Sequence, residues 1–152
     1  LLKVVSSMLK LTTLINKITQ DHPELKLDSG ERFAFHPPNT IFYSEQSGSE
    51  RPDLLILHEL GHYLNGNQDY TSDIALLRIE SEAWETAKKL TKKYKIKWDE
   101  DFAQDRLDSY RDWMHSASLC SFCNINGYQD TNGLYHCPLC NKKWPRQEIP
   151  ED

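Results

Sequence analysis

Long apolar runs are missing from this chain of 152 residues, and so is any surplus of positive charge. No run reaches the roughly 18 apolar residues that a membrane-spanning helix needs. The formal net charge is -5, so the chain lacks the global basic field that attracts nucleic acid or anionic membranes. A partner of either kind would need a local basic patch. We therefore expect no membrane partner.

Cysteine is absent outside two Cys-x-x-Cys pairs, Cys120/Cys123 and Cys137/Cys140. The apolar opening of the chain is interrupted by lysines at regular intervals and is followed by no small-residue cleavage site, so we expect no signal peptide there. Without a secretion signal, cysteines paired in this way indicate a reducing compartment, and metal binding in place of disulfides. The sequence thus predicts a cytoplasmic, metal-binding protein.

The length of the chain suits one compact domain with a small appendage. Composition changes at Ser116. From there onward the chain is too short and too poor in aliphatic residues to build a core, so it needs a staple. We predict an α+β protein in two parts, a mainly helical domain with a small antiparallel β-sheet over residues 1–115 and a four-cysteine zinc ribbon over residues 116–152.

Apolar spacing predicts a helix at the start of the chain and a pair of short strands after it. The strands, or a hairpin, lie around the turn-forming "HPPN" with Phe33, Phe35, Ile41 and Tyr43 at period two. The apolar face of the first helix comprises Leu1, Val4, Val5, Met8, Leu11, Ile15 and Ile18.

Three further helices are predicted from start and stop residues. The first begins near Pro52 and ends at Gly66. The second runs from Asp73 to about Tyr94, capped by Thr71 or Ser72, and the third from about Asp99 to His115. The apolar face of the second comprises Leu76, Ile79, Ala83, Ala87, Leu90 and Tyr94.

The helix that begins near Pro52 carries "HELGH". Residues four apart share one helix face, so His58 and His62 can both direct a ring nitrogen at one ion. Glu59 lies about 100° around the helix, beside the ion, where it can take a proton from water. Gly61 would let another backbone come close. The pattern predicts a catalytic zinc site with Glu59 as general base, the alternative being a chance match or two hydrogen-bonded core histidines.

A catalytic zinc needs a third protein ligand and one open position. A third histidine at the spacing of the long His-Glu-x-x-His-x-x-Gly-x-x-His motif is excluded, because Gln68 stands there. The following helix offers Glu80, Glu82 and Glu85. Periodicity slightly favours Glu80, whereas the small neighbours of Glu82 would allow another helix near. The residues alone leave both open.

"HELGH" followed by "ESEAWETAKKL" resembles the ImmA/IrrE family of metallopeptidase-like proteins, whose zinc site is similar to that of gluzincins. The family has a glutamate directly before alanine at the start of a Glu-Ala-x-x-x-Ala stretch, which implies Glu82 as the third ligand. The resemblance covers roughly Phe33 to Tyr94, with Trp84 where the family usually has Asn. It implies a zincin-like fold for residues 1–115 and an endopeptidase that cleaves a regulatory protein such as a helix-turn-helix repressor.

"CSFC" and "CPLC" are separated by thirteen residues, Asn124 to His136. That linker is long enough to turn back, and it contains Asn132-Gly133, a preferred hairpin pair. The spacing predicts a structural zinc with four thiolates and no open position, and it disfavours a free-thiol or redox pair. The predicted ligands are Cys120, Cys123, Cys137 and Cys140.

Two function classes remain open. The first is a zinc-dependent metalloendopeptidase with one catalytic and one structural Zn²⁺, and Glu59 favours it because a purely structural site has no use for that carboxylate. The alternative is a non-catalytic zinc-ribbon regulator that binds nucleic acid or protein. "NKKWPR" is basic and aromatic, but residues 116–152 hold three basic and four acidic side chains, so nucleic acid is not favoured. A zinc hydrolase of a non-peptide substrate ranks third.

Overall fold

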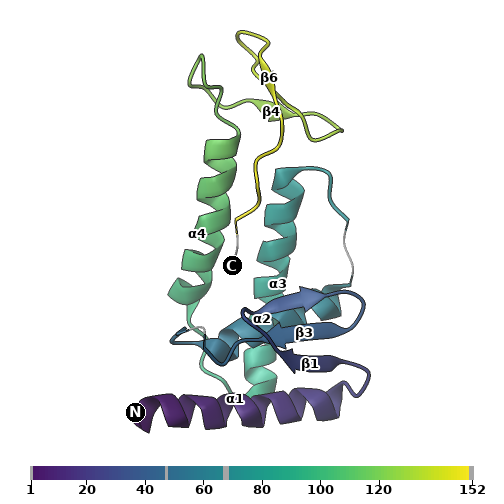
Figure 1. Cartoon of the computed structure of the whole chain (residues 1–152), viewed down its shortest axis with the longest axis vertical. Coiled ribbons are helices and arrows are strands. Elements are labelled where there is room, and N and C mark those ends of the chain that lie inside the picture. Colours follow the sequence, from purple (N-terminus) through teal and green to yellow (C-terminus); the bar gives the residue numbers. More distant parts are fainter. Residues whose placement is uncertain (1, 47, 67–68, 151–152) are drawn as a thin grey trace. The chain divides into compact units, whose positions relative to one another are not determined.

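The computed structural model describes residues 2–46, 48–66 and 69–150, without the side chains of residues 3–9. These residues form an α+β structure, as predicted (Figure 1). The elements follow in the order α1 (Leu2–Asp21), β1 (Lys26–Ser29), β2 (Ala34–His36), β3 (Thr40–Tyr43), α2 (Pro52–Asn65), α3 (Asp73–Tyr94), α4 (Glu100–Ala117), β4 (Tyr128–Gln129), β5 (Tyr135–His136) and β6 (Lys143–Trp144).

The chain divides into two compact units. One comprises Leu1–Asn67 and Glu82–Trp98, and the other comprises Gln68–Ser81 and Asp99–Asp152. Helix α3 contributes residues to both. The division differs from the predicted boundary between residues 115 and 116, because α4 and the beginning of α3 belong to the same unit as the cysteine-rich segment.

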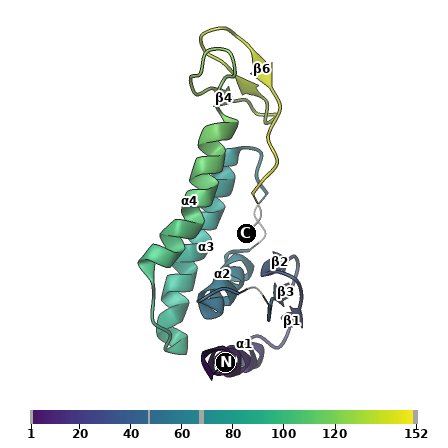
Figure 2. The same ribbon diagram turned by 60° about the vertical axis from the view of Figure 1, so that its left-hand side comes forward.

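A three-stranded sheet of order β1-β3-β2 lies in the first unit. Strands β2 and β3 pair antiparallel with Phe35 opposite Ile41, which confirms the predicted strand pair. Strand β1 was not predicted and pairs parallel with β3, so the sheet is mixed and the expectation of a purely antiparallel sheet is corrected. Helix α2 contacts β2 and β3, while α1 contacts β1 and α2 (Figures 1 and 2).

Helix α2 lies at the centre of the first unit's core. Its residues 54–57 and Leu60 are buried, together with Ile41 of β3. From α1, Leu11, Leu14 and Ile18 join them, whereas Ile15 is only partly buried. The predicted core positions Leu1, Val4, Val5 and Met8 lie outside the described side chains.

The predicted helix ends agree with the structure to within two residues. Pro52 occupies a first-turn position of α2, where its missing N–H costs no hydrogen bond, and Gly66 ends the helix with φ 84°. Ser72 caps α3, because its Oγ accepts a hydrogen bond of 3.2 Å from the N–H of Ala75. Asp99 caps α4 by accepting from the backbone N–H three residues on.

The second unit contains the antiparallel sheet β4-β5-β6, which follows the C-terminal end of α4 (Figure 2). The turn between β4 and β5 has Gly133 at φ 84°, and the N–H of Asn132 donates to Oδ1 of Asp130 at 2.8 Å. The predicted turn is therefore confirmed. Within the described ranges, no helix combines the length and the apolar character that crossing a membrane would require.

Candidate metal centres

The four cysteines come together at one end of the second unit. Their Sγ atoms all lie within 4.8 Å of one another, and none is in a disulfide. The Sγ atoms of Cys120 and Cys140 are 3.7 Å apart. Four thiolates bound tetrahedrally at about 2.3 Å would stand about 3.8 Å apart. The cluster therefore fits a tetrahedral metal ion and is compatible with the predicted zinc ribbon.

Each Cys-x-x-Cys pair closes the same backbone turn. The N–H of Asn124 donates to the carbonyl of Cys120 at 2.8 Å, and the N–H of Asn141 donates to the carbonyl of Cys137 at 3.1 Å. Both asparagines have positive φ, 56° and 63°. Asparagine adopts this left-handed conformation more readily than most residues, so the repeated Cys-x-x-Cys-Asn string encodes two equivalent turns.

Backbone N–H groups also point at the sulfur atoms. Cys137 Sγ accepts from the N–H groups of Cys140 at 3.5 Å and Leu139 at 3.4 Å. The hydrogen bond from the Cys140 N–H is the main cause that lowers the pKa of the Cys137 thiol to about 7. A hydrogen bond with Cys140 is the main cause that raises the pKa of Cys123 to about 12. The cluster thus holds one thiol that ionises near neutral pH, and a metal ion would bind all four cysteines as thiolates.

Asp73, at the start of α3, is attached to the ribbon in the second unit. Its carboxylate is 1% exposed, accepts a short hydrogen bond from the hydroxyl of Tyr135 and pairs with Nε of Arg146 at 2.5 Å. Its N–H donates to Oε1 of Gln129 at 2.7 Å. Burial, ahead of the Asp73 hydrogen bond, raises the pKa of Tyr135. No local sequence pattern predicts this network, because each partner of Asp73 lies more than fifty residues along the chain from it.

Two histidines and one glutamate form the second candidate centre. The ligand atoms of His58, His62 and Glu80 all lie within 4.8 Å of one another. The Nε2 atoms of the histidines are 3.1 Å apart. Two nitrogens bound to one tetrahedral zinc at about 2.05 Å would lie about 3.3 Å apart. The donor set and its spacing thus fit a divalent ion that prefers nitrogen and oxygen ligands.

Helices α2 and α3 approach closely beside these histidines. A Cβ placed on Gly61 would lie 2.5 Å from the carbonyl oxygen of Ala83, closer than real side chains come. Oγ1 of Thr86 donates to Oδ1 of Asn65 at 2.8 Å near the end of α2. The close backbone approach expected at Gly61 is therefore present, and only glycine permits it.

The structure brings Glu80, not Glu82, to the histidines. Glu80 is 6% exposed and follows Leu76 by one turn, whereas Glu82 is exposed. Glu80 lies on the packed face of α3, one turn before Trp84, which is 4% exposed and stacks on the ring of His58. The group in the structure therefore differs from the assignment that the resemblance implied, which was Glu82.

Glu59 lies on α2 between the two histidines and is 5% exposed. It is not one of the three grouped side chains, as expected for a residue turned about 100° from His58. Tyr63, a candidate donor to an oxyanion by residue type, instead donates to Oε1 of Glu24 at 2.6 Å.

The chain was compared with models of protein families, with curated proteins and with solved structures, and none of the three comparisons found a match. The resemblance to the ImmA/IrrE family therefore stays a prediction from the motifs. The function has to be argued from the two centres.

Proposed function

We propose that this chain is a zinc-dependent metalloendopeptidase of ImmA/IrrE type with a catalytic and a structural zinc ion. The observation that supports the proposal most is the grouping of His58, His62 and Glu80 within 4.8 Å, next to the buried carboxylate of Glu59. Three protein ligands leave a tetrahedral ion one position for water or substrate, which is the composition of a catalytic zinc site.

In the proposed reaction the residues divide the work. A bound zinc ion would supply Lewis-acid polarisation of a peptide carbonyl and activation of water. His58 and His62 from α2 and Glu80 from α3 would hold that ion. Glu59 accepts the proton of the attacking water and delivers it to the departing amine, so its carboxylate must begin ionised.

The substrate class follows from the motif resemblance. The stretch from "HELGH" to "ESEAWETA" is similar to a family associated with cleaving regulatory proteins, so a helix-turn-helix repressor is the proposed substrate. The paired cysteines, which are typical of metal binding in a reducing compartment, support a cytoplasmic location as part of the proposal. The zincin-like fold of the domain that carries the motif belongs to this proposal as well.

The cysteine cluster takes the structural role. Its four thiolates fill a tetrahedron, so a zinc ion there has no open position and stabilises the fold. The side chains of Tyr135 and Arg146, which belong to the cysteine-rich segment, both bond the carboxylate of Asp73. A folded segment would therefore also stabilise the first turn of α3.

The proposal is tested by metal content and turnover together. We expect about two zinc ions per wild-type chain, and one each in His58→Ala and Cys120→Ser. Glu59→Gln should retain both ions, with cleavage of a proteome-derived peptide library, read by mass spectrometry, reduced at least about a thousandfold. Wild-type cleavage that Glu59→Gln leaves intact would contradict the mechanism.

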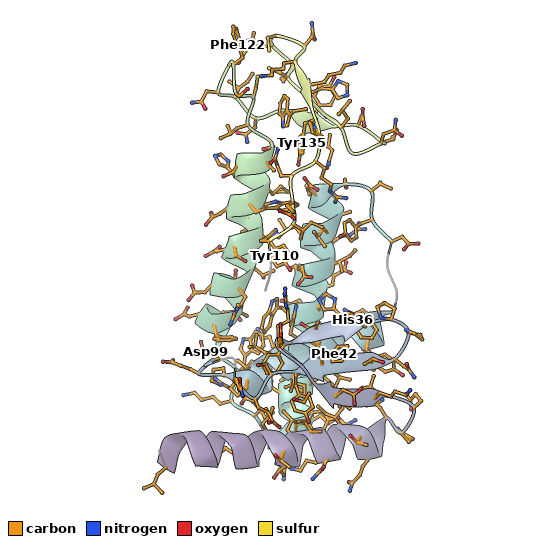
Figure 3. The ribbon with its side chains drawn as sticks, viewed as in Figure 1. His36, Phe42, Asp99, Tyr110, Phe122 and Tyr135 are labelled. Atoms are coloured by element: carbon orange, nitrogen blue, oxygen red, sulfur yellow. The ribbon has the colours of Figure 1, made fainter. Side chains whose placement is uncertain are left out.

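The second candidate function is a non-catalytic binding module, favoured by one observation. The third residue of each cysteine pair is strongly exposed and apolar, with Phe122 at 82% and Leu139 at 71%. Figure 3 labels the side chain of Phe122 on the cysteine-rich segment. Exposed apolar side chains mark a contact surface where they form a contiguous patch, as two residues at equivalent places in the two cysteine turns could do together. A wild-type chain that binds both ions, cleaves nothing in the peptide library and loses a bound partner on Phe122→Ser would favour this alternative.

A further inference from the structure

Trp84 of α3 lies flat on the imidazole of His58. The ring centroids are 4.3 Å apart and the planes differ by 23°. Both side chains are almost fully buried, at 4% and 3% exposed. Nothing in the ligand geometry requires an aromatic ring at this place, so the contact calls for a separate explanation.

The indole has a second ring against it. Trp98 meets it edge-on, with centroids 6.2 Å apart and planes at 63°, and Nζ of Lys88 stands 5.9 Å from the Trp98 ring. The neighbouring residue Ala83 of α3 lies in close backbone contact with Gly61 of α2. The Trp84 ring therefore packs between the imidazole of His58 and the ring of Trp98.

We propose that Trp84 is a positioning residue that raises the affinity of the His58–His62–Glu80 centre for a divalent cation. This inference rests on the metal site of the proposed function. An imidazole that gives its lone pair to a cation becomes electron-poor, and the electron-rich face of an indole stabilises such a ring. The stack also keeps His58 from rotating, so less side-chain freedom is lost on binding.

A Trp84 that only filled the core would behave differently. Removing it would lower the stability of the metal-free fold, while the affinity of the remaining folded protein for metal would stay the same. A positioning role predicts a loss of affinity that persists after folding is controlled. It also predicts that another aromatic ring, but not an aliphatic side chain of similar bulk, restores the affinity.

The test compares Trp84→Phe and Trp84→Leu with the matched variant Trp98→Leu, which removes an indole that does not stack on His58. Zn²⁺ and Co²⁺ alone are the probes, titrated against a competing chelator. Thiolate charge-transfer absorption of Co²⁺ identifies the cysteine centre and separates it from the other. We expect Trp84→Leu to weaken the histidine centre about five- to tenfold, within the range of a desolvated cation–π contact. Trp84→Phe should stay within about twofold of wild type. Trp98→Leu keeps the stack on His58 and removes only the edge contact to Trp84, so it should lose less affinity than Trp84→Leu.

A second measurement does not depend on how Trp84→Leu folds. Co²⁺ at the histidine centre should quench indole fluorescence in the wild type, and Trp84→Phe should remove most of that quenching. Unchanged affinity in folded Trp84→Leu, or unchanged quenching in Trp84→Phe, would overturn the inference and leave the proposed function standing. A wild type that binds an ion only at its cysteines would overturn both.

Discussion

The cysteine cluster takes its ligands from the 21 residues Cys120 to Cys140, and the histidine–glutamate group takes its ligands from the 23 residues His58 to Glu80. The spans are nearly equal. The motifs predicted all four members of the first group, but in the second they predicted His58 and His62 and, from the resemblance, Glu82 where the structure groups Glu80. What differs is the kind of backbone that carries the ligands.

In the ribbon, each pair of thiolates is aimed by a turn that its own residues close through local hydrogen bonds. In the helical centre, α2 aims His58 and His62 by itself, but the third ligand comes from another helix. The rotation of α3 about its axis decides which glutamate arrives, and two positions along a helix amount to about 200°. A local motif therefore predicts the side chains that one turn or one helix brings together, whereas helix packing decides which side chain of another helix joins them.

The largest effect is expected when a cluster ligand is removed. Cys120→Ser should release one zinc ion and unfold the ribbon, because binding of a structural zinc supplies about 10 kcal/mol or more of folding free energy in small zinc domains. The histidine centre should keep its ion. Metal analysis and chelator titration of the purified variant check both points. Loss of both ions together would show that the two centres are not independent.

Replacing the third helical ligand should have the next largest effect. Glu80→Gln should lower the zinc affinity of the histidine centre at least about a hundredfold, because even outer-shell changes cost ten- to a hundredfold. The matched variant Glu82→Gln, two positions along α3 on the exposed face, should stay near wild type. Competition with a chromophoric chelator measures both. The reverse ranking would restore the assignment that the motif resemblance implied.

The same contrast explains what the sequence could reveal of the fold. Helix bounds followed from Pro52, Gly66 and Asp99, which act within one turn, and the strand pair followed from period two. Strand β1 was missed because "KLDS" is short and mostly exposed, so its pairing with β3 leaves no alternation to detect. The network around Asp73 was missed for the opposite reason, since it joins residues distant in sequence.

One glycine in each of the two regions allows the same packing test to be made on both. A Cβ on Gly61 would lie 2.5 Å from the carbonyl oxygen of Ala83, and one on Gly127 would lie 2.5 Å from that of His136. Neither glycine has positive φ, so alanine meets no backbone strain and its cost comes from crowding, offset in part at Gly61 by the better helix propensity of alanine. Each change to alanine should destabilise its own region by about 1–3 kcal/mol, measured by chemical denaturation with zinc present.

The outcome also reports on the metal centres. Gly61→Ala forces α2 and α3 apart and should weaken the histidine centre, while Gly127→Ala should spare it. Equal losses of zinc affinity at the histidine centre in the two variants would mean that this centre depends on packing in both regions.

Backbone conformation in the ribbon should have a smaller effect. Asn141 has φ 63°, so Asn141→Ala places an ordinary L-residue in the left-handed region at a cost of about 1 kcal/mol. Asn141→Gly should be near neutral, because glycine adopts that region freely. Thermal unfolding of the zinc-loaded chain distinguishes the two. Equal destabilisation by both would mean that the asparagine side chain, not its φ, matters.

The smallest effect is expected from a surface carboxylate of the first unit. The hydroxyl of Tyr94 donates to Asp21 at 2.8 Å, and this bond, followed by one from Lys93, lowers the pKa of that carboxyl. Because the folded pKa lies below the unfolded one, the contribution to stability is present above about pH 4 and is lost as the pH falls through the folded pKa. Asp21→Asn should therefore differ slightly from wild type at pH 7 and converge with it near pH 2.

Acid also protonates the cysteine thiols and releases their zinc, so global unfolding would mix the two effects. Amide hydrogen exchange in α1 and in the C-terminal turn of α3 is therefore the measurement. Wild type and Asp21→Asn should differ in protection there only above the pKa of Asp21. A difference that grew toward low pH would mean that the bond from Tyr94 does not stabilise the ionised carboxylate.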